Sequence, residues 1–155
     1  HWRCRAEWTP ESWQFGLGVF VDNQIVGVQD MGAKDFANLR EVLTGSWLGS
    51  AYEGKGIGTE MRAAVLHFAF EGLGSAIARS TARASNVASL RVSEKLGYRT
   101  NGSIRAVFGD EQVDTEVLLE LVRDDWLPLR RSDIEIEGLD SCIDMFGCNQ
   151  ESRRG

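Results

Sequence analysis

The sequence has no apolar run long enough to cross a bilayer, and no signal peptide is visible at its start. Only 2 of the 155 residues are proline and the charges are dispersed, which argues against long disordered segments. The 3 cysteines, at positions 4, 142 and 148, lack paired spacing, so a disulfide framework is not predicted. No His/Cys cluster has zinc-ligand spacing, and we predict no metal site. Together these absences favour a cytoplasmic protein.

The sequence also lacks a basic stripe. Its net charge is −6, and basic residues do not alternate with aromatic ones, so we predict neither a nucleic-acid nor a membrane partner. An acidic surface is compatible with a cationic substrate such as an amine. A modest net charge that only keeps the protein soluble explains the same composition.

The length predicts a single domain over residues 1–155. Apolar periodicity and turn residues predict an order of β-hairpin, strand, helix, strand, helix and β-hairpin, which gives a mixed sheet of the α/β or α+β class. The apolar tail after Asp124 should pack onto this body. The expected ranges are Phe15–Val21, Gln24–Val28, Arg40–Leu48, Gly56–Glu71, Ser75–Thr81, a helix opened by Ser85 or Asn86 and stopped by Gly97, Gly102–Phe108 and Gln112–Val122.

A glycine-rich segment stands between a strand pattern and a helix pattern. Gly54, Gly56 and Gly58 occupy alternate positions. Glycine tolerates positive φ and has no Cβ, so neighbouring N–H groups can converge on one point, and the helix that follows adds its own unpaired N–H groups. This arrangement favours a phosphate or pyrophosphate site. A plain tight turn between strand and helix is the alternative.

The segment matches neither of two common phosphate loops, since G-x-G-x-G is not the G-x-G-x-x-G fingerprint and no G-K-[ST] ending follows. The preceding strand, Arg40–Leu48, contains Gly45, which is typical of a bulge or a close backbone approach. The following helix has one apolar face, formed by Met61, Ala64, Val65, Phe68 and Ala69.

These motifs resemble those of the GNAT N-acetyltransferase superfamily. Glu53-Gly54-Lys55-Gly56-Ile57-Gly58 occupies the family signature Gln/Arg-x-x-Gly-x-Gly/Ala. Asn86 opens the next helix, and Lys95-Leu96-Gly97-Tyr98 is similar to the ending that follows in the family. Trp47-Leu48 and Ser89 are similar to the branch that acetylates N-terminal amines of ribosomal proteins.

The resemblance implies a GNAT-like, mostly antiparallel sheet with a central β-α-β-α unit and helices on both faces. It implies acetyl-CoA as cofactor, with its pyrophosphate on the loop amides and its pantetheine arm along the strand near Trp47, Leu48 and Gly49. Asn86 would hydrogen-bond the end of the pantetheine, while helix capping is its other role. The implied cofactor-binding residues are Trp47, Leu48, Glu53, Gly54, Lys55, Gly56, Ile57, Gly58, Thr59 and Asn86.

The sequence departs from the family pattern at three places. Glu53 stands where relatives have Gln or Arg, and a carboxylate near a pyrophosphate is unfavourable unless its side chain points away. Ser93 occupies the position of a tyrosine general acid, which makes Ser89 the better candidate for that role. Only Arg3 to Trp13 precedes the first hairpin, so the strand and helices with which the family opens are either absent or belong to a longer natural protein.

The implied reaction is direct transfer of an acetyl group to a primary amine of a peptide, a protein or a small molecule. Glu41 is the candidate base and Ser89 the candidate acid, against the simpler roles of a surface carboxylate and a surface serine. Thr44 and Ser46 are weaker candidates. An aminoglycoside-type acetyltransferase, a non-catalytic acyl-CoA-binding module and a nucleotide-binding protein are the alternatives.

The apparent absence of a first strand predicts an exposed sheet edge, which is a surface prone to pairing. We therefore expect the chain to self-associate, with a second copy or the apolar C-terminal tail covering that gap.

Overall fold

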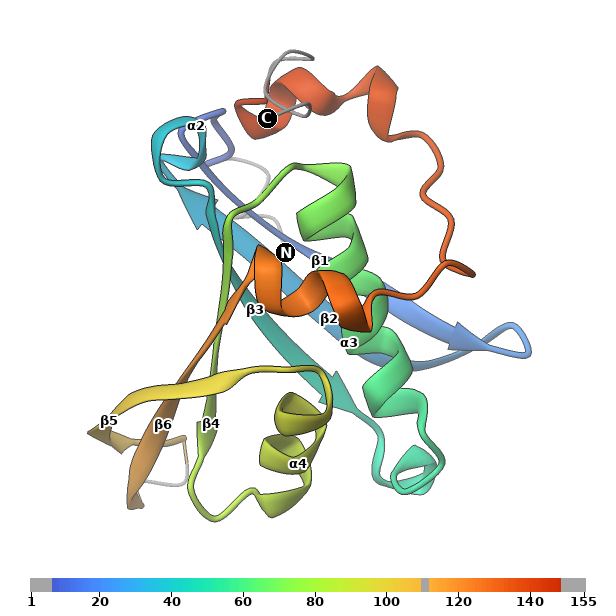
Figure 1. Ribbon diagram of the computed structural model, residues 1–155. Helices are drawn as coiled ribbons and strands as arrows, with labels where there is room; N and C mark the ends of the chain where they lie inside the picture. Colours follow the sequence, from blue (N-terminus) through green and yellow to red (C-terminus); the bar gives the residue numbers. More distant parts are fainter. Residues whose placement is uncertain (1–6, 110–111, 149–155) are drawn as a thin grey trace.

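The computed structural model describes residues 7–109 and 112–148. In this part of the chain, six strands form one sheet: β1 (Ser12–Val21), β2 (Gln24–Lys34), β3 (Glu41–Leu48), β4 (Ile77–Arg83), β5 (Arg99–Val107) and β6 (Val113–Val122). The strand order is β1-β2-β3-β4-β6-β5 (Figure 1). β3 and β4 run parallel, and the other neighbouring pairs run antiparallel. The expected mixed, mostly antiparallel sheet is confirmed.

The helices follow the predicted order. They are α2 (Phe36–Leu39), α3 (Ile57–His67), which continues as a π-helical turn over Phe68–Gly72, α4 (Val87–Lys95) and α5 (Arg123–Trp126). Short 3-10 turns cover Ser50–Tyr52, Leu127–Leu129, Leu139–Ser141 and Ile143–Phe146. Strand β3, helix α3, strand β4 and helix α4 form the predicted β-α-β-α unit.

Local signals explain several element boundaries. Asp22 and Asn23 have φ of 49° and 62°, as a two-residue hairpin turn requires, and they join β1 to β2. The Asn86 side chain accepts a hydrogen bond from the Ser89 N–H at 3.1 Å and caps α4. Gly97 has φ of +89° just beyond the end of α4, as predicted for a glycine stop.

β2 is longer than its sequence pattern indicated. It extends to Lys34 because β1 pairs with it along its whole length, from Val21↔Gln24 to Ser12↔Lys34. The expected connection after Lys34 contains the single-turn helix α2. We expected the second hairpin turn at Gly109-Asp110, and Asp110 lies outside the described residues.

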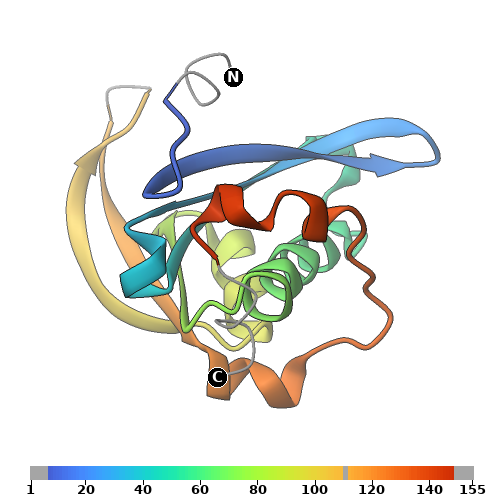
Figure 2. The same cartoon turned by 90° about the horizontal axis from the view of Figure 1, so that it is seen from above.

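One face of the sheet carries the core. Met31, Val42, Ala78 and Leu121 are at most 1 % exposed and point to this inner face, which α3, α4 and α5 cover (Figure 2). Residues of alternate parity, such as Leu43, point to the other face and are more exposed. The described helices therefore lie on one face of the sheet, whereas we expected helices on both.

The C-terminal tail packs onto the body, as expected. Trp126 stacks on Phe70 with ring centroids 4.9 Å apart, and Phe146 meets Trp13 edge-on at 5.1 Å. The Trp13 indole N–H also donates to the Phe146 carbonyl at 3.2 Å. These contacts place the described part of the tail on the helix-covered side of the sheet. Self-association through an exposed sheet edge remains a prediction.

Candidate functional site

The sheet opens between its two parallel strands. β3 pairs with β4 from Glu41↔Ile77 to Thr44↔Ser80, and the pairing then ends. On its other side, β3 remains paired with β2 as far as Leu48↔Gly27. Residues 45–48 thus form a strand edge beside a gap, which is the splay that a ligand with amide groups would fill.

The backbone of this edge points alternately to the two sides. The Gly49 N–H donates to the Val26 carbonyl at 2.9 Å, and the Gly45 carbonyl accepts from the Gln29 side chain, so these residues face β2. By strand alternation, the N–H and C=O groups of Ser46 and Leu48 face the gap. The predicted pantetheine segment therefore has unpaired backbone groups, while the Trp47 side chain is 64 % exposed.

The glycine-rich loop lies next to this edge and opens α3. Within the described residues, the N–H groups of residues 54–58 have no recorded acceptor, whereas Glu53 N–H donates to Ser50 O and Thr59 N–H donates to Gly56 O. Gly54 and Gly56 have φ of +71° and +85°, and a Cβ at either would meet nothing within 4 Å. Five unpaired donors beside open space at a helix N-terminus form a site that fits a phosphate group.

The charged side chains of the loop leave this concavity open. Lys55 places its Nζ 5.4 Å from the centroid of the Tyr52 ring. Glu53 is exposed, and its backbone N–H is already used within the loop. Its side chain is thus open to solvent, and its unfavourable effect on a bound pyrophosphate stays a prediction.

α4 brings the two remaining predicted residues to the helix-covered side of the splay. Asn86 uses its Oδ1 for capping, and its amide nitrogen has no partner within residues 7–109 and 112–148. Ser89 is half-buried, and its hydroxyl likewise has no hydrogen-bond partner in this part of the chain. The capping role of Asn86 is thus observed, and the amide nitrogen remains available for a second bond.

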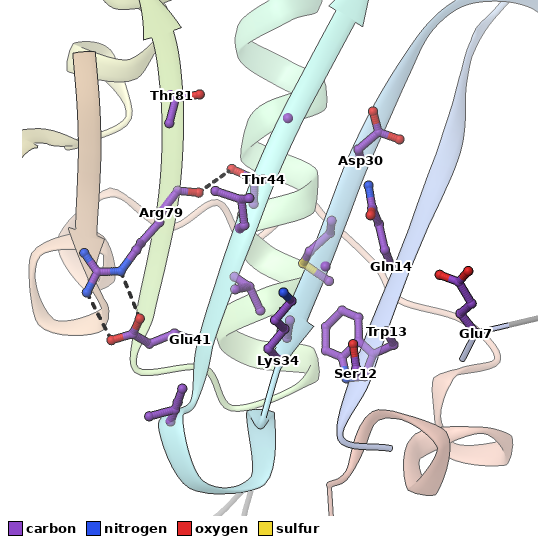
Figure 3. A pocket seen from close by; sticks show the side chains of 17 residues that line it. Glu7, Ser12, Trp13, Gln14, Asp30, Lys34, Glu41, Thr44, Arg79 and Thr81 are labelled. Atoms are coloured by element: carbon purple, nitrogen blue, oxygen red, sulfur yellow. Dashed lines mark hydrogen bonds and ion pairs between the residues drawn. The ribbon is translucent and has the colours of Figure 1, made fainter. Parts of the chain in front are cut away.

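Glu41 lies apart from these groups. It is the first residue of β3, on the opposite face of the sheet from α4, and seven residues of extended strand, or about 23 Å, separate it from Leu48. Arg79 donates Nε and Nη2 to the two Glu41 carboxylate oxygens at 2.9 and 3.1 Å (Figure 3). These hydrogen bonds hold the pKa of Glu41 below its usual range. The structure does not bring Glu41 and Ser89 together.

A hollow of about 820 Å³ occupies the helix-free face of the sheet. Side chains of β1 to β4 line it, and Figure 3 shows Asp30, Lys34, Glu41 and Arg79 around it, so both signs of charge are present. No sequence pattern indicated this hollow, because most of the residues that line it come from four different strands.

A buried arginine on α3 is the main feature that sequence reasoning missed. Arg62 is 5 % exposed and contacts α4. It stands one position after Met61, on a helix whose apolar face was predicted only in part. Met61, Val65 and Ala69 are buried as expected, whereas Ala64 and Phe68 are half-buried. Ala63 and Leu66, which we did not expect on this face, are buried. An arginine at position 62 has no local sign of burial, since its surroundings come from α4 and from Tyr98.

No helix in residues 7–109 and 112–148 is both long and apolar enough to span a membrane.

Comparison with known sequences gives matches to one family. The profile of the acetyltransferase (GNAT) domain matches residues 1–99. Probable N-acetyltransferase YjcK of Bacillus subtilis is 30 % identical over 109 residues, which cover 66 % of this chain and 60 % of that protein. The chain thus spans about 60 % of the length of the curated relative that it matches.

Solved structures share the fold. A protein described as a probable acetyltransferase has a TM-score of 0.69 at 23 % identity, with coverage of 80 % of this chain and 68 % of the other. RimJ of Mycobacterium smegmatis, solved in complex with CoA-disulfide, has a TM-score of 0.68 at 24 % identity, with coverage of 74 % and 55 %. At these identities the likeness shows the fold alone.

Proposed function

The chain belongs to the GNAT acetyltransferase family, and from this premise we propose that it transfers an acetyl group from acetyl-CoA to a primary amine. One observation carries the proposal. The unpaired N–H groups of residues 54–58 open α3 directly beside the unpaired edge of β3. A pyrophosphate joined to an amide-bearing arm needs these two features side by side.

Each part of acetyl-CoA has a matching group. The amides of residues 54–58 would donate hydrogen bonds to the pyrophosphate. The positive end of the α3 dipole would attract the same negative charge. Ser46 and Leu48 would pair with the pantetheine amides as a neighbouring strand would. The amide nitrogen of Asn86 would donate to the arm from the other side of the gap.

The chemistry is direct acyl transfer. The amine nitrogen attacks the thioester carbonyl, the C–N bond forms, the C–S bond breaks, and sulfur leaves as a thiolate. Ser89 is the candidate acid for that thiolate, because its hydroxyl has no other partner among the described residues. Holding both substrates in line supplies most of the rate enhancement.

The candidate base Glu41 is less well suited to its role than the candidate acid Ser89. Arg79 lowers the basicity of Glu41, and a base with a pKa far below neutrality accepts a proton weakly. Because Glu41 also lies on the opposite face of the sheet from Ser89, we assign it a minor role without contact to the attacking amine, whose proton would pass to solvent water.

The acceptor that we favour is the N-terminal amine of a peptide or protein. The Trp47-Leu48 and Ser89 resemblance supports this choice, and RimJ is among the structural neighbours. A small cationic amine is the second candidate, because Asp30 and Glu41 line the hollow.

The first experiment separates cofactor binding from turnover. Acetyl-CoA, CoA, ATP and NAD are each added at equal concentration in a thermal-shift assay. Acetyl-CoA and CoA at about a hundred times their dissociation constants should add about 2.7 kcal/mol of stability, and ATP and NAD should add little. An equal shift with ATP would contradict the proposal.

The second experiment measures transfer to a panel of peptides with different N-termini, polyamines and aminoglycosides. Acetylation of at least one amine is expected. Binding of acetyl-CoA without any transfer would identify a non-catalytic acyl-CoA-binding module instead.

A further inference from the structure

Arg62 is a cation enclosed between the two helices of the site. Its Nη1 donates to the Ser89 carbonyl at 3.2 Å, and its Nη2 donates to the Ser93 hydroxyl at 2.9 Å. The Ser93 hydroxyl in turn donates to the Ser89 carbonyl at 3.0 Å. Ser93 is 1 % exposed, so it cannot reach a ligand, and its hydroxyl is occupied by Arg62 and Ser89.

Among the described residues, no carboxylate pairs with Arg62. Its third neighbour is Tyr98, whose ring centroid lies 5.6 Å from the guanidinium carbon. Burial raises the pKa of Tyr98, so the phenol stays neutral and does not balance the cation. A buried charge without a counter-ion is costly, which indicates that the site meets an anion when it is occupied.

The cation lies close to the splay. The Tyr98 hydroxyl is 3.1 Å from the Thr44 hydroxyl, and Thr44 is the last residue of β3 that pairs with β4. On the other side, Arg62 holds the main chain of Ser89, the candidate acid. The gap that a thioester would enter is bordered by Thr44 on β3 and by Ser89 on α4. Arg62 contacts Ser89 directly and reaches Thr44 through Tyr98.

We propose that Arg62 lowers the pKa of the CoA thiol and stabilises the thiolate that leaves during acetyl transfer. This inference rests on the proposed function. When the C–S bond breaks, sulfur keeps the electron pair, and a fixed cation in a low-dielectric site stabilises that charge. Ser93, which stands where the family resemblance expects a tyrosine acid, serves to hold Arg62. Arg62 acts through its field and through Ser89, and is a positioning residue.

Few other charges face Arg62. The charged side chains of α4 are exposed and make no recorded contact with it, and those of β3 and β4 lie on the opposite face of the sheet. The groups concerned are Arg91, Glu94 and Lys95 on α4, Glu41 on β3, and Arg79 and Arg83 on β4. On α3 itself, Glu60 is exposed. Tyr98 is thus the titratable group in contact with the guanidinium in the part of the chain that the structure describes.

The test compares CoA with desulfo-CoA, which has hydrogen in place of the thiol. Their dissociation constants are measured by calorimetry from about pH 6.5 to about pH 9.5, across the range in which thiols titrate. If bound CoA has a thiol pKa about one unit below that of free CoA, CoA binds about tenfold tighter at high pH while desulfo-CoA does not. The dissociation constant of desulfo-CoA divided by that of CoA therefore rises with pH in the wild-type protein.

Variants separate the effect of the Arg62 charge from that of its hydrogen bond to Ser93. Arg62→Met removes the charge at similar volume and should flatten the ratio, whereas Arg62→Lys keeps the charge and should retain most of the rise. Ser93→Ala loosens the tie, keeps the cation, and should also retain the rise. If Arg62→Met does not fold, Arg62→Gln, which is neutral and keeps N–H donors for Ser89 and Ser93, takes its place and should flatten the ratio in the same way.

The possible failures are distinguishable. A flat ratio in the wild-type protein, with tight CoA binding, overturns the role of Arg62 and leaves the proposed function standing. A rise that persists in Arg62→Met assigns the effect to the helix N-termini and also overturns it. Absence of CoA binding in the wild-type protein overturns the proposed function and this inference together.

Discussion

The two ends of β3 are built differently. At Glu41, the strand pairs with β4, and Arg79 bridges Glu41 to Glu120 on β6. At Leu48, the strand pairs with β2 alone, and the loop that follows has unpaired N–H groups. The first end spends its hydrogen-bonding groups within the fold, and the second leaves them for a ligand. Unsatisfied backbone groups, rather than charged side chains, mark the binding site that we propose.

The largest expected effect comes from the loop at the Leu48 end. Gly56→Val places a side chain at φ of +85°, in open space where a phosphate would lie, and should weaken acetyl-CoA binding at least about a hundredfold. Gly138→Val is the matched control, because Gly138 has φ of +78°, also has no atom within 4 Å of its Cβ, and lies in the tail. Calorimetry and denaturation are measured on both variants.

Both substitutions should cost similar stability, about 1–3 kcal/mol for a strained backbone, and the control should keep its affinity. If Gly56→Val folds and binds acetyl-CoA as tightly as the control does, the loop is only a turn.

The second prediction compares candidate catalytic groups on the two faces of the sheet. Ser89→Ala removes the proposed general acid and should lower kcat about a hundredfold, the usual contribution of a positioned acid. Glu41→Gln should lower kcat less than about tenfold, because Arg79 already holds the Glu41 pKa low. Both are assayed with the best acceptor from the amine panel.

Dissociation constants for acetyl-CoA should stay unchanged in both variants. A larger loss of kcat for Glu41→Gln than for Ser89→Ala would reverse the assignment and make the Glu41 end of β3 the chemical one.

How far the sequence predicts these features depends on how local their signals are. The Asn86 cap, the Gly97 stop and the Asp22-Asn23 turn each depend on a few neighbouring residues, and the structure confirms them. The glycine loop was found in the same way. Family resemblance, which rests on these local motifs, then implied the mixed, mostly antiparallel sheet and its β-α-β-α unit, but not the strand order.

Features made by distant residues escaped prediction. Arg62 is buried by contacts with Ser89, Ser93 and Tyr98, which lie 27 to 36 positions later in the chain. The residues next to Arg62 in the sequence therefore do not indicate its burial. The length of β2 depends on its pairing with β1. The packing of the tail onto the body was predicted, but its contact of Phe146 with Trp13 was not. The ion pair of Glu41 with Arg79 likewise joins two strands, so the sequence did not indicate that the Glu41 carboxylate is paired.

The third prediction concerns the charge at the edge of the loop. Glu53→Gln removes an exposed carboxylate beside the phosphate site and should leave acetyl-CoA affinity equal or raise it by about threefold, since solvent screens the repulsion. Glu94→Gln, an exposed change on α4, is the control and should have no effect. A clear loss of affinity in Glu53→Gln would mean that this carboxylate supports the loop, and the Leu48 end would then also depend on a charged side chain.

The smallest expected effect is on stability at the Glu41 end. Arg79 keeps the folded-state pKa of Glu41 below its unfolded value, so the ion pair stabilises the fold above the unfolded pKa, and this contribution is lost as pH falls through the folded pKa. Since the two side chains are 39 % and 31 % exposed, solvent screens the pair, and Glu41→Gln should cost only about 0.5 kcal/mol near neutral pH. Urea denaturation at about pH 7 and about pH 3 should show that cost at the higher pH and little difference at the lower one.

Asp30→Asn is the control, because Asp30 lines the same hollow and makes no ion pair among the described residues. A cost in Glu41→Gln that is equal at both pH values would mean that Glu41 stabilises β3 by packing and neutral hydrogen bonds, and the electrostatic half of the contrast between the two ends would be lost.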